Sequence, residues 1–121
     1  PTPPPSPPPL PADGKRVLIV YESTESTKLT ADQAAAINGT PFRTYLTRVV
    51  SKGPDGVTPE WRIWDKDVSL ASVSDTWKKA MALERKSVPW LIVSNGISGY
   101  SGVLPKTMPE IEAIVQQYLG N

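Results

Sequence analysis

Apolar residues in this sequence gather in short uninterrupted runs that are separated by longer stretches with helical spacing. The segment 16–21 reads Arg-Val-Leu-Ile-Val-Tyr, and further apolar or aromatic segments follow at 60–65 and 88–94. A short run without polar alternation is typical of a strand that is covered on both faces, as in the middle of an α/β sheet. A fourth, glycine-rich strand is expected at 97–104, after the hairpin signal Ser94-Asn95-Gly96.

The stretches between these runs carry helix signals. Thr30 and Gln33 have the spacing of a capping box, ahead of an alanine-rich stretch that stops at Asn38-Gly39. Thr40 is expected to cap a second helix, with Pro41 at its first helical position. We therefore expect four helices, near residues 27–38, 40–52, 74–86 and 108–119.

Residues 1–12 differ in composition from the rest of the chain. Eight of the 14 prolines fall within the first 11 residues, and such a run favours an extended polyproline II conformation, with a rise of about 3.1 Å per residue. This arm is either a stiff spacer or a ligand for an aromatic-lined groove of a proline-binding module. Residues 13–121 are expected to form one domain, because two independent cores would not fit in this length.

The expected order of elements is strand, helix, helix, strand, helix, strand, strand, helix. This order resembles the thioredoxin fold, in which a βαβ unit is followed by a ββα unit. The second half carries the most specific similarity, because Val88-Pro89-Trp90 enters a strand and Asn95-Gly96 follows it. The resemblance implies an α/β protein, a three-layer α/β/α sandwich with a central mixed four-stranded sheet. It also implies that a cis peptide bond precedes Pro89.

The residues that make thioredoxins reactive are missing. The family carries Cys-x-x-Cys at the start of the helix after its first strand, where this chain has Thr24-Glu25-Ser26-Thr27. Threonine hydroxyls do not ionise near neutral pH, whereas disulfide exchange needs a thiolate. What the resemblance leaves is a surface beside the proline, where the family pairs backbone groups with an extended peptide or with glutathione. The expected binding residues are Thr24, Glu25, Ser26, Thr27, Val88, Pro89 and Trp90.

Composition argues against several classes of chemistry. The chain has no cysteine and no histidine, so it lacks thiol chemistry, the commonest general base and the commonest zinc ligand. Asp65 and Asp67 are close in sequence, but no further oxygen ligand follows before Asp75, so a solvated turn is expected there. No partner group makes Glu22 and Glu25 an acid/base pair. We therefore predict no catalytic residue, metal or cofactor, and a protein that is not an enzyme.

Four tryptophans in 121 residues is a high count. Trp61 and Trp64 are three positions apart on a predicted strand, so they are expected to point to opposite faces. We expect Trp64 and Trp77 to pack in the core, whereas Trp61 and Trp90 can equally line a surface.

Charge and hydropathy narrow the range of partners. Thirteen Lys and Arg residues balance 12 Asp and Glu residues, for a net charge of +1, and this weak field argues against nucleic acid. No run of about 18 apolar residues occurs, so we expect no membrane insertion by this chain. The absence of cysteine fits any compartment, so localisation stays open, as does the oligomeric state.

Three functions are compatible with these features. The first is a redox-inactive thioredoxin-like domain that binds proteins or serves as an accessory part of a larger assembly, tethered by residues 1–12. The second is a glutathione-type ligand binder or transferase that uses the hydroxyl of Thr24 or Ser26 beside Pro89. The third is a rigid spacer whose role is geometric.

Overall fold

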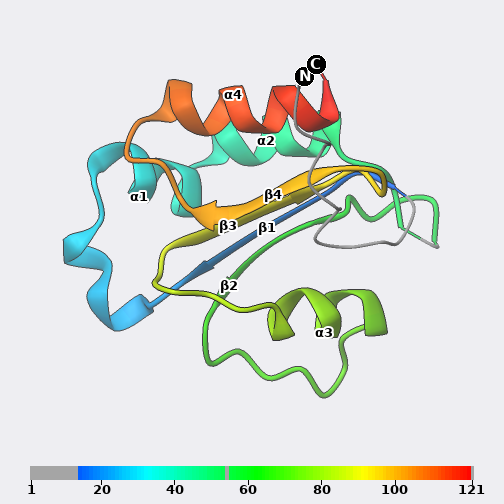
Figure 1. Cartoon of the computed structure of the whole chain (residues 1–121), viewed down its shortest axis with the longest axis horizontal. Coiled ribbons are helices and arrows are strands. Elements are labelled where there is room, and N and C mark those ends of the chain that lie inside the picture. The colour runs from blue at the N-terminus through cyan, green and yellow to red at the C-terminus, as the bar shows by residue number, and fades with distance from the viewer. Residues whose placement is uncertain (1–13, 54, 121) are drawn as a thin grey trace, which may run out of the picture.

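The computed structural model describes residues 14–53 and 55–120, and this part of the chain contains one four-stranded sheet with helices on both sides (Figure 1). The order of strands across the sheet is β2-β1-β3-β4. β1 runs parallel to β2 and antiparallel to β3, and β3 runs antiparallel to β4. The strands are β1 (Arg16–Tyr21), β2 (Trp61–Asp65), β3 (Trp90–Ser94) and β4 (Gly99–Val103).

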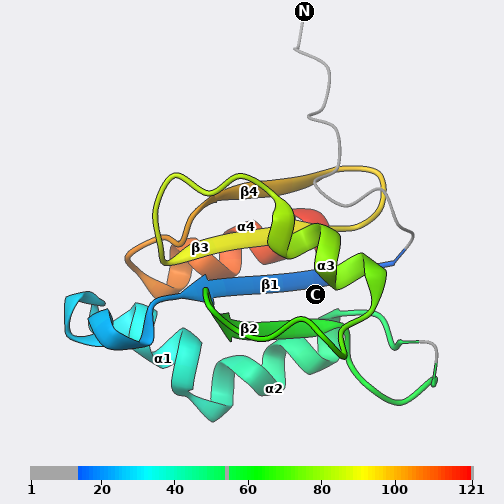
Figure 2. The same cartoon turned by 90° about the horizontal axis from the view of Figure 1, so that it is seen from below.

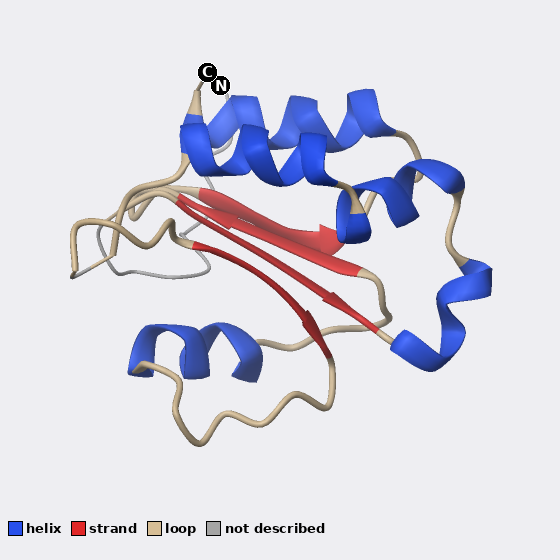
Figure 3. Ribbon diagram, turned by 180° about the vertical axis from the view of Figure 1, so that it is seen from behind, coloured by secondary structure: helices blue, strands red, loops and turns tan. Residues whose placement is uncertain are grey.

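The helices are divided unequally between the two faces of the sheet. Three of them lie together on one face and α3 lies alone on the other, as Figures 1 and 3 show. A 3-10 segment, η1 (Ser23–Lys28), connects β1 to the first helix. The helices are α1 (Ala31–Asn38), α2 (Thr40–Val49), α3 (Asp75–Ala82) and α4 (Met108–Leu119). The predicted α/β class, with a mixed four-stranded sheet and four helices, is confirmed.

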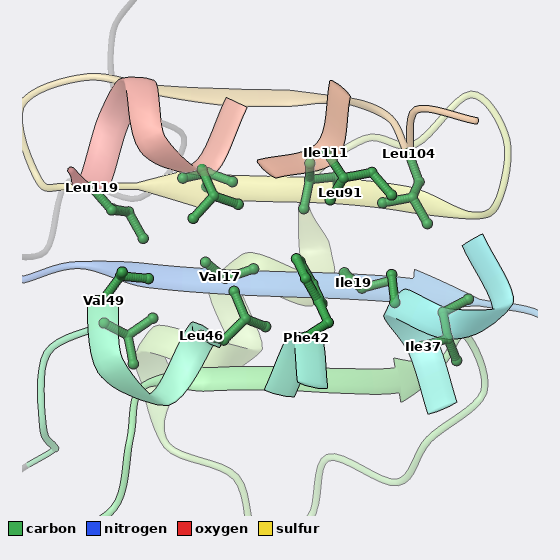
Figure 4. Packing of buried hydrophobic residues seen from close by; sticks show 14 residues of the cluster. Val17, Ile19, Ile37, Phe42, Leu46, Val49, Leu91, Leu104, Ile111 and Leu119 are labelled. Carbon is green, nitrogen blue, oxygen red and sulfur yellow. The ribbon is translucent and has the colours of Figure 1, made fainter. Parts of the chain in front are cut away.

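β1 lies at the centre of the core. Its residues 17–20 are fully buried, since β2 and β3 flank the strand and helices cover both of its faces. Val17 and Ile19 pack in the cluster under α1, α2 and α4 (Figure 4), whereas Leu18 and Val20 pack in the cluster under α3. This double burial explains why the sequence of the strand shows no polar alternation.

The tryptophans divide between the two faces. Trp61 is half-buried against the cluster under α2, and its indole N–H donates to Thr47 Oγ1 at 2.9 Å. Trp64 packs on the α3 side, where its ring meets the buried Trp77 edge-on at 5.9 Å between centroids. The prediction that Trp61 and Trp64 point to opposite faces is therefore confirmed.

The start of α1 differs from the prediction, and a capping box sets it. Residues 27–30 lie outside α1, because η1 contains a kink at Glu25 (φ −113°, ψ 21°) and the helix begins only at Ala31. The N–H of Gln33 donates to Thr30 Oγ1, and the N–H of Thr30 donates to Gln33 Oε1, each at 3.1 Å. The amide nitrogen of Gln33 also donates to the carbonyl of Leu104 at 2.9 Å, which ties α1 to the chain that leaves β4.

Two further helices also end earlier than predicted. α2 stops at Val49 because Val50 turns extended and is buried. α3 stops at Ala82, where Leu83 turns extended, so residues 83–86 lie outside the helix. Thr40 is the first residue of α2 rather than its cap, since Gly39 occupies the N-cap position.

The two later strands are shorter than predicted. β3 begins at Trp90 rather than at residue 88, and a proline in the preceding position cannot donate to a ladder. β4 covers Gly99–Val103 rather than 97–104, since the turn before it contains Gly96 with a φ of 87°.

Truncation of a central core residue is expected to cost more than truncation on the outer strand β2. Leu91→Ala should lower the free energy of unfolding by about 2–5 kcal/mol, because this side chain is fully buried. Ile63→Ala should cost less, since Ile63 is only half-buried. Urea unfolding of both variants measures the difference, and equal losses would contradict the looser packing of β2.

Candidate functional site

The two sequence segments of the predicted binding surface meet at the carboxyl end of β1 (Figure 1). β1 leads into η1, and Pro89 immediately precedes Trp90, which pairs with Val20 near the end of β1. A cavity of about 90 Å³ lies between these segments. Its lining residues are Glu22, Glu25, Lys28, Leu29, Val88 and Pro89.

Val88 and Pro89 form the β3 side of this cavity. The peptide bond between them is cis. The carbonyl of Pro89 accepts the N–H of Leu104 at 3.1 Å, which fixes the chain against the end of β4. Within the described residues, no hydrogen bond engages the backbone N–H or C=O of Val88. This open pair of backbone groups borders the cavity and has the chemistry needed to pair with an extended peptide.

The residues of η1 contribute less to the cavity than the sequence suggests. Glu25 lines it and pairs with Lys28 at 3.5 Å, but both side chains are exposed, so this ion pair adds little stability. The hydroxyl of Thr24 donates to Glu22 Oε1 at 2.9 Å, and its backbone N–H donates to the same oxygen at 3.2 Å. Thr24 and the exposed Thr27 are not among the lining residues, and Ser26 lies between them in η1.

Trp90 lies apart from the cavity. Its ring is buried in the cluster under α3, with 7% of the residue exposed. Its indole N–H donates to Ser101 Oγ at 3.0 Å. The structure therefore brings Glu25, Val88 and Pro89 together and places Trp90 in the core.

A polar cluster beside η1 was only partly visible in the sequence. Carboxylate oxygens of Glu22, Asp65 and Asp67 lie within 4.8 Å of one another. The ammonium of Lys66 lies 3.1 Å from Glu22 and 3.3 Å from Asp67. Asp65 accepts the backbone N–H groups of Ser23 and Asp67, both at 2.8 Å. The cluster's own cation and backbone donors thus occupy these carboxylates and hold η1 against the end of β2.

Pairing between β1 and β2 brings Glu22 to this cluster. Tyr21 stands opposite Asp65 in the parallel register, so the residue after each strand end lies nearby. The sequence predicts Asp65 and Asp67 in one turn but does not indicate that Glu22 lies beside them. The parallel pairing of the first two strands is the signal that would have found it.

These hydrogen bonds change the ionisation of the cluster. The backbone N–H and hydroxyl of Thr24, together with Lys66, lower the pKa of Glu22. The backbone N–H groups of Asp67 and Ser23 lower the pKa of Asp65. The carboxylates of Glu22 and Asp67 raise the pKa of Lys66 in turn. Each shift favours the charged form of the group concerned.

Comparisons of the chain with protein-family models, with curated proteins and with solved structures found no match. Among the helices of residues 14–53 and 55–120, none is both long enough and apolar enough to cross a bilayer.

The folded chain is expected to lose stability at acidic pH through this cluster. Glu22 and Asp65 have lower pKa values folded than unfolded. Their contribution is therefore fully present above the unfolded values of about 4 and is lost as the pH falls through the folded values.

Urea unfolding at neutral pH and at an acidic pH below the folded pKa values of Glu22 and Asp65 measures this loss. The wild-type chain should lose more stability between the two conditions than Asp65→Asn, which lacks one of the titrating carboxylates. Glu84→Gln, which removes an exposed carboxylate outside the cluster, is the control and should lose as much as the wild type. Equal losses in the wild type and Asp65→Asn would contradict the role of the cluster.

Proposed function

We propose that this chain is a thioredoxin-like domain without redox activity that binds extended segments of other proteins beside Val88 and Pro89. The order and directions of its strands support the fold assignment. They correspond to a βαβ unit joined to a ββα unit around one sheet, which is the arrangement that the resemblance implies. The segment that replaces the reactive cysteines of the family, η1, directly follows the central strand.

The open backbone of Val88 is the observation that carries this proposal. In the described part of the chain its N–H and C=O have no hydrogen-bond partner, although β3, which begins two residues later, pairs with β1 and β4 from its first residue. An extended peptide offers one C=O and one N–H to such a pair, whatever its side chains are. Each bond contributes only about 0.5–1.5 kcal/mol, so the affinity depends on what else the partner buries.

The chemistry of the cavity supports binding rather than catalysis. The chain has no thiol and no imidazole. Of the two carboxylates that line the cavity, Glu22 is held by Thr24 and Lys66, and Glu25 pairs with Lys28. The bonds to Glu22 lower its pKa, which does not suit a general acid or base near neutral pH.

A glutathione-type ligand is the second candidate. Lys28 favours it, because this cation lines the same cavity as Val88 and could attract a carboxylate of a small peptide. The hydroxyl of Thr24 weighs against it, since this group already donates to Glu22 and Thr24 does not line the cavity. Extended protein segments therefore remain the preferred partners.

A titration of the isotope-labelled full chain tests the preferred function. The probe is a strand-forming, uncharged synthetic peptide, acetyl-Gly-Thr-Val-Thr-Val-Thr-Gly-amide. We expect the amide resonances of Val88 and Leu29 to shift with peptide concentration, because both residues line the cavity. Shifts confined to Ser101 and Val103 would contradict the proposal, since the peptide would then be adding to the outer edge of β4.

Glutathione, added in the same way, tests the alternative. If it binds through a hydroxyl of η1, Thr24→Ala should weaken binding. Thr27→Ala is the matched control, because it makes the same change in the same segment without removing the hydroxyl that donates to the lining residue Glu22. Unchanged resonances at millimolar glutathione would remove this alternative and leave the preferred function standing.

A further inference from the structure

A larger cavity runs along β2 on the α3 side of the sheet, from Arg16 at the start of β1 to Trp64, which pairs with Val20. Figure 2 views the sheet from the side on which α3 lies. Its volume is about 540 Å³, within the range of about 300–1,000 Å³ that is typical of ligand sites. Flat groups form its walls, since the guanidinium of Arg62 lies 4.8 Å from the ring centre of Trp77, and Trp64 meets that ring edge-on. A second hollow of about 330 Å³ shares Thr58, Arg62 and Trp64 with it.

The carboxylates of this cavity are already occupied. Glu60 is buried, with its oxygens 3.5 Å from Arg16 and 3.7 Å from Arg62, and it accepts the indole N–H of Trp77 at 3.2 Å. Asp55 accepts backbone N–H groups of its own turn, and bonds within this turn lower its pKa to about 2. A ligand rich in hydrogen-bond donors would therefore find these acceptors engaged.

Some hydrogen-bond donors at this cavity have no acceptor among the described residues. Three of the four tryptophans donate their indole N–H to a side chain, at 2.9–3.2 Å. Trp64 is the exception: among the described residues its N–H has no acceptor, and its ring lines both hollows. The first turn of α3 lies at the rim, where the N-cap Ser74 makes no side-chain capping bond and leaves backbone N–H groups without partners.

Aromatic walls and open donors are complementary to a segment that carries acceptors but few donors. Proline supplies this chemistry, because each proline has a backbone C=O and no N–H. Polyproline II segments also leave their carbonyls free and dock into aromatic-lined grooves. This chain contains a segment of that composition, because eight of its residues 1–11 are proline.

This segment is joined to the domain beside the cavity. A Cβ placed on Gly14 would lie 3.3 Å from Arg16 Nη1, and Arg16 lines the cavity. Pro11 is three residues before Gly14, a span of at most about 11 Å of extended chain. Such a short tether gives an effective concentration on the order of millimolar, which favours the segment of the same chain over that of a second copy.

We propose that residues 1–11 bind in the cavity between Trp64 and α3 of the same chain, where the indole N–H of Trp64 donates to a proline carbonyl. The arm is then a ligand of its own domain rather than a spacer. This proposal is independent of peptide binding at Val88, because the two cavities share no lining residue.

Indole proton resonances of the full-length chain test the proposal. The comparison is between the wild type and a full-length variant in which each of the eight prolines in residues 1–11 is replaced by glycine. We expect the Trp64 indole resonance to move in the variant and its proton to exchange with solvent about tenfold faster, since one hydrogen bond is lost. The Trp90 indole, which donates to Ser101, is the internal reference and should not change.

A synthetic peptide with the sequence of residues 1–11 provides the second arm of the test. Added to the glycine variant, it should return the Trp64 resonance to its wild-type position, whereas the same peptide with glycine for proline should not. In a chain that carries Trp64→Phe together with the glycine replacements, the peptide should bind about tenfold more weakly, since an aromatic ring remains but the indole N–H is lost.

Two results would overturn the proposal. Identical Trp64 resonances in the wild type and the glycine variant would leave residues 1–11 as a spacer. A wild-type Trp64 resonance that moves with protein concentration would mean that the cavity takes the segment of a second copy.

Discussion

Burial of β1 on both faces is the constraint on which the rest of this structure depends. Residues 17–20 are closed to solvent by helices above and below, and the flanking strands occupy both edges. The middle of the sheet therefore offers no surface to a partner. The two cavities discussed above therefore lie beside this strand, one where the chain leaves its carboxyl end and the other along β2 on the α3 side.

At the carboxyl end, hydrogen bonds take over the role that apolar packing has in the core. η1 is mostly exposed, so its position depends on the carboxylates of Glu22 and Asp65, which accept N–H groups of Thr24 and Ser23. Thr24, which occupies the place of a reactive cysteine in the thioredoxin resemblance, thus helps to fix η1 through its bonds to Glu22. Among the described residues at this end, Val88 keeps an open pair of backbone groups beside the segment that these bonds fix.

The sequence predicted best what depends on burial and on local capping. The buried strands were recognisable because burial on both faces removes polar alternation, and the capping box of Thr30 and Gln33 lies within one helical turn. Contacts between distant segments have no comparable pattern in the sequence. The approach of Glu22 to Lys66 needs the register of β1 and β2, and the early ends of α2 and α3 follow from tertiary contacts rather than from periodicity.

The central claim is that the hydrogen bonding of the sheet stops short of Val88 and leaves its backbone open to a partner. Residue-resolved amide hydrogen exchange of the full chain tests this most directly. The account predicts that the Val88 amide exchanges near the rate of an unstructured peptide, whereas the amide of Leu91, in the ladder between β3 and β4, is protected by orders of magnitude. A Val88 amide as strongly protected as that of Leu91 would contradict the account.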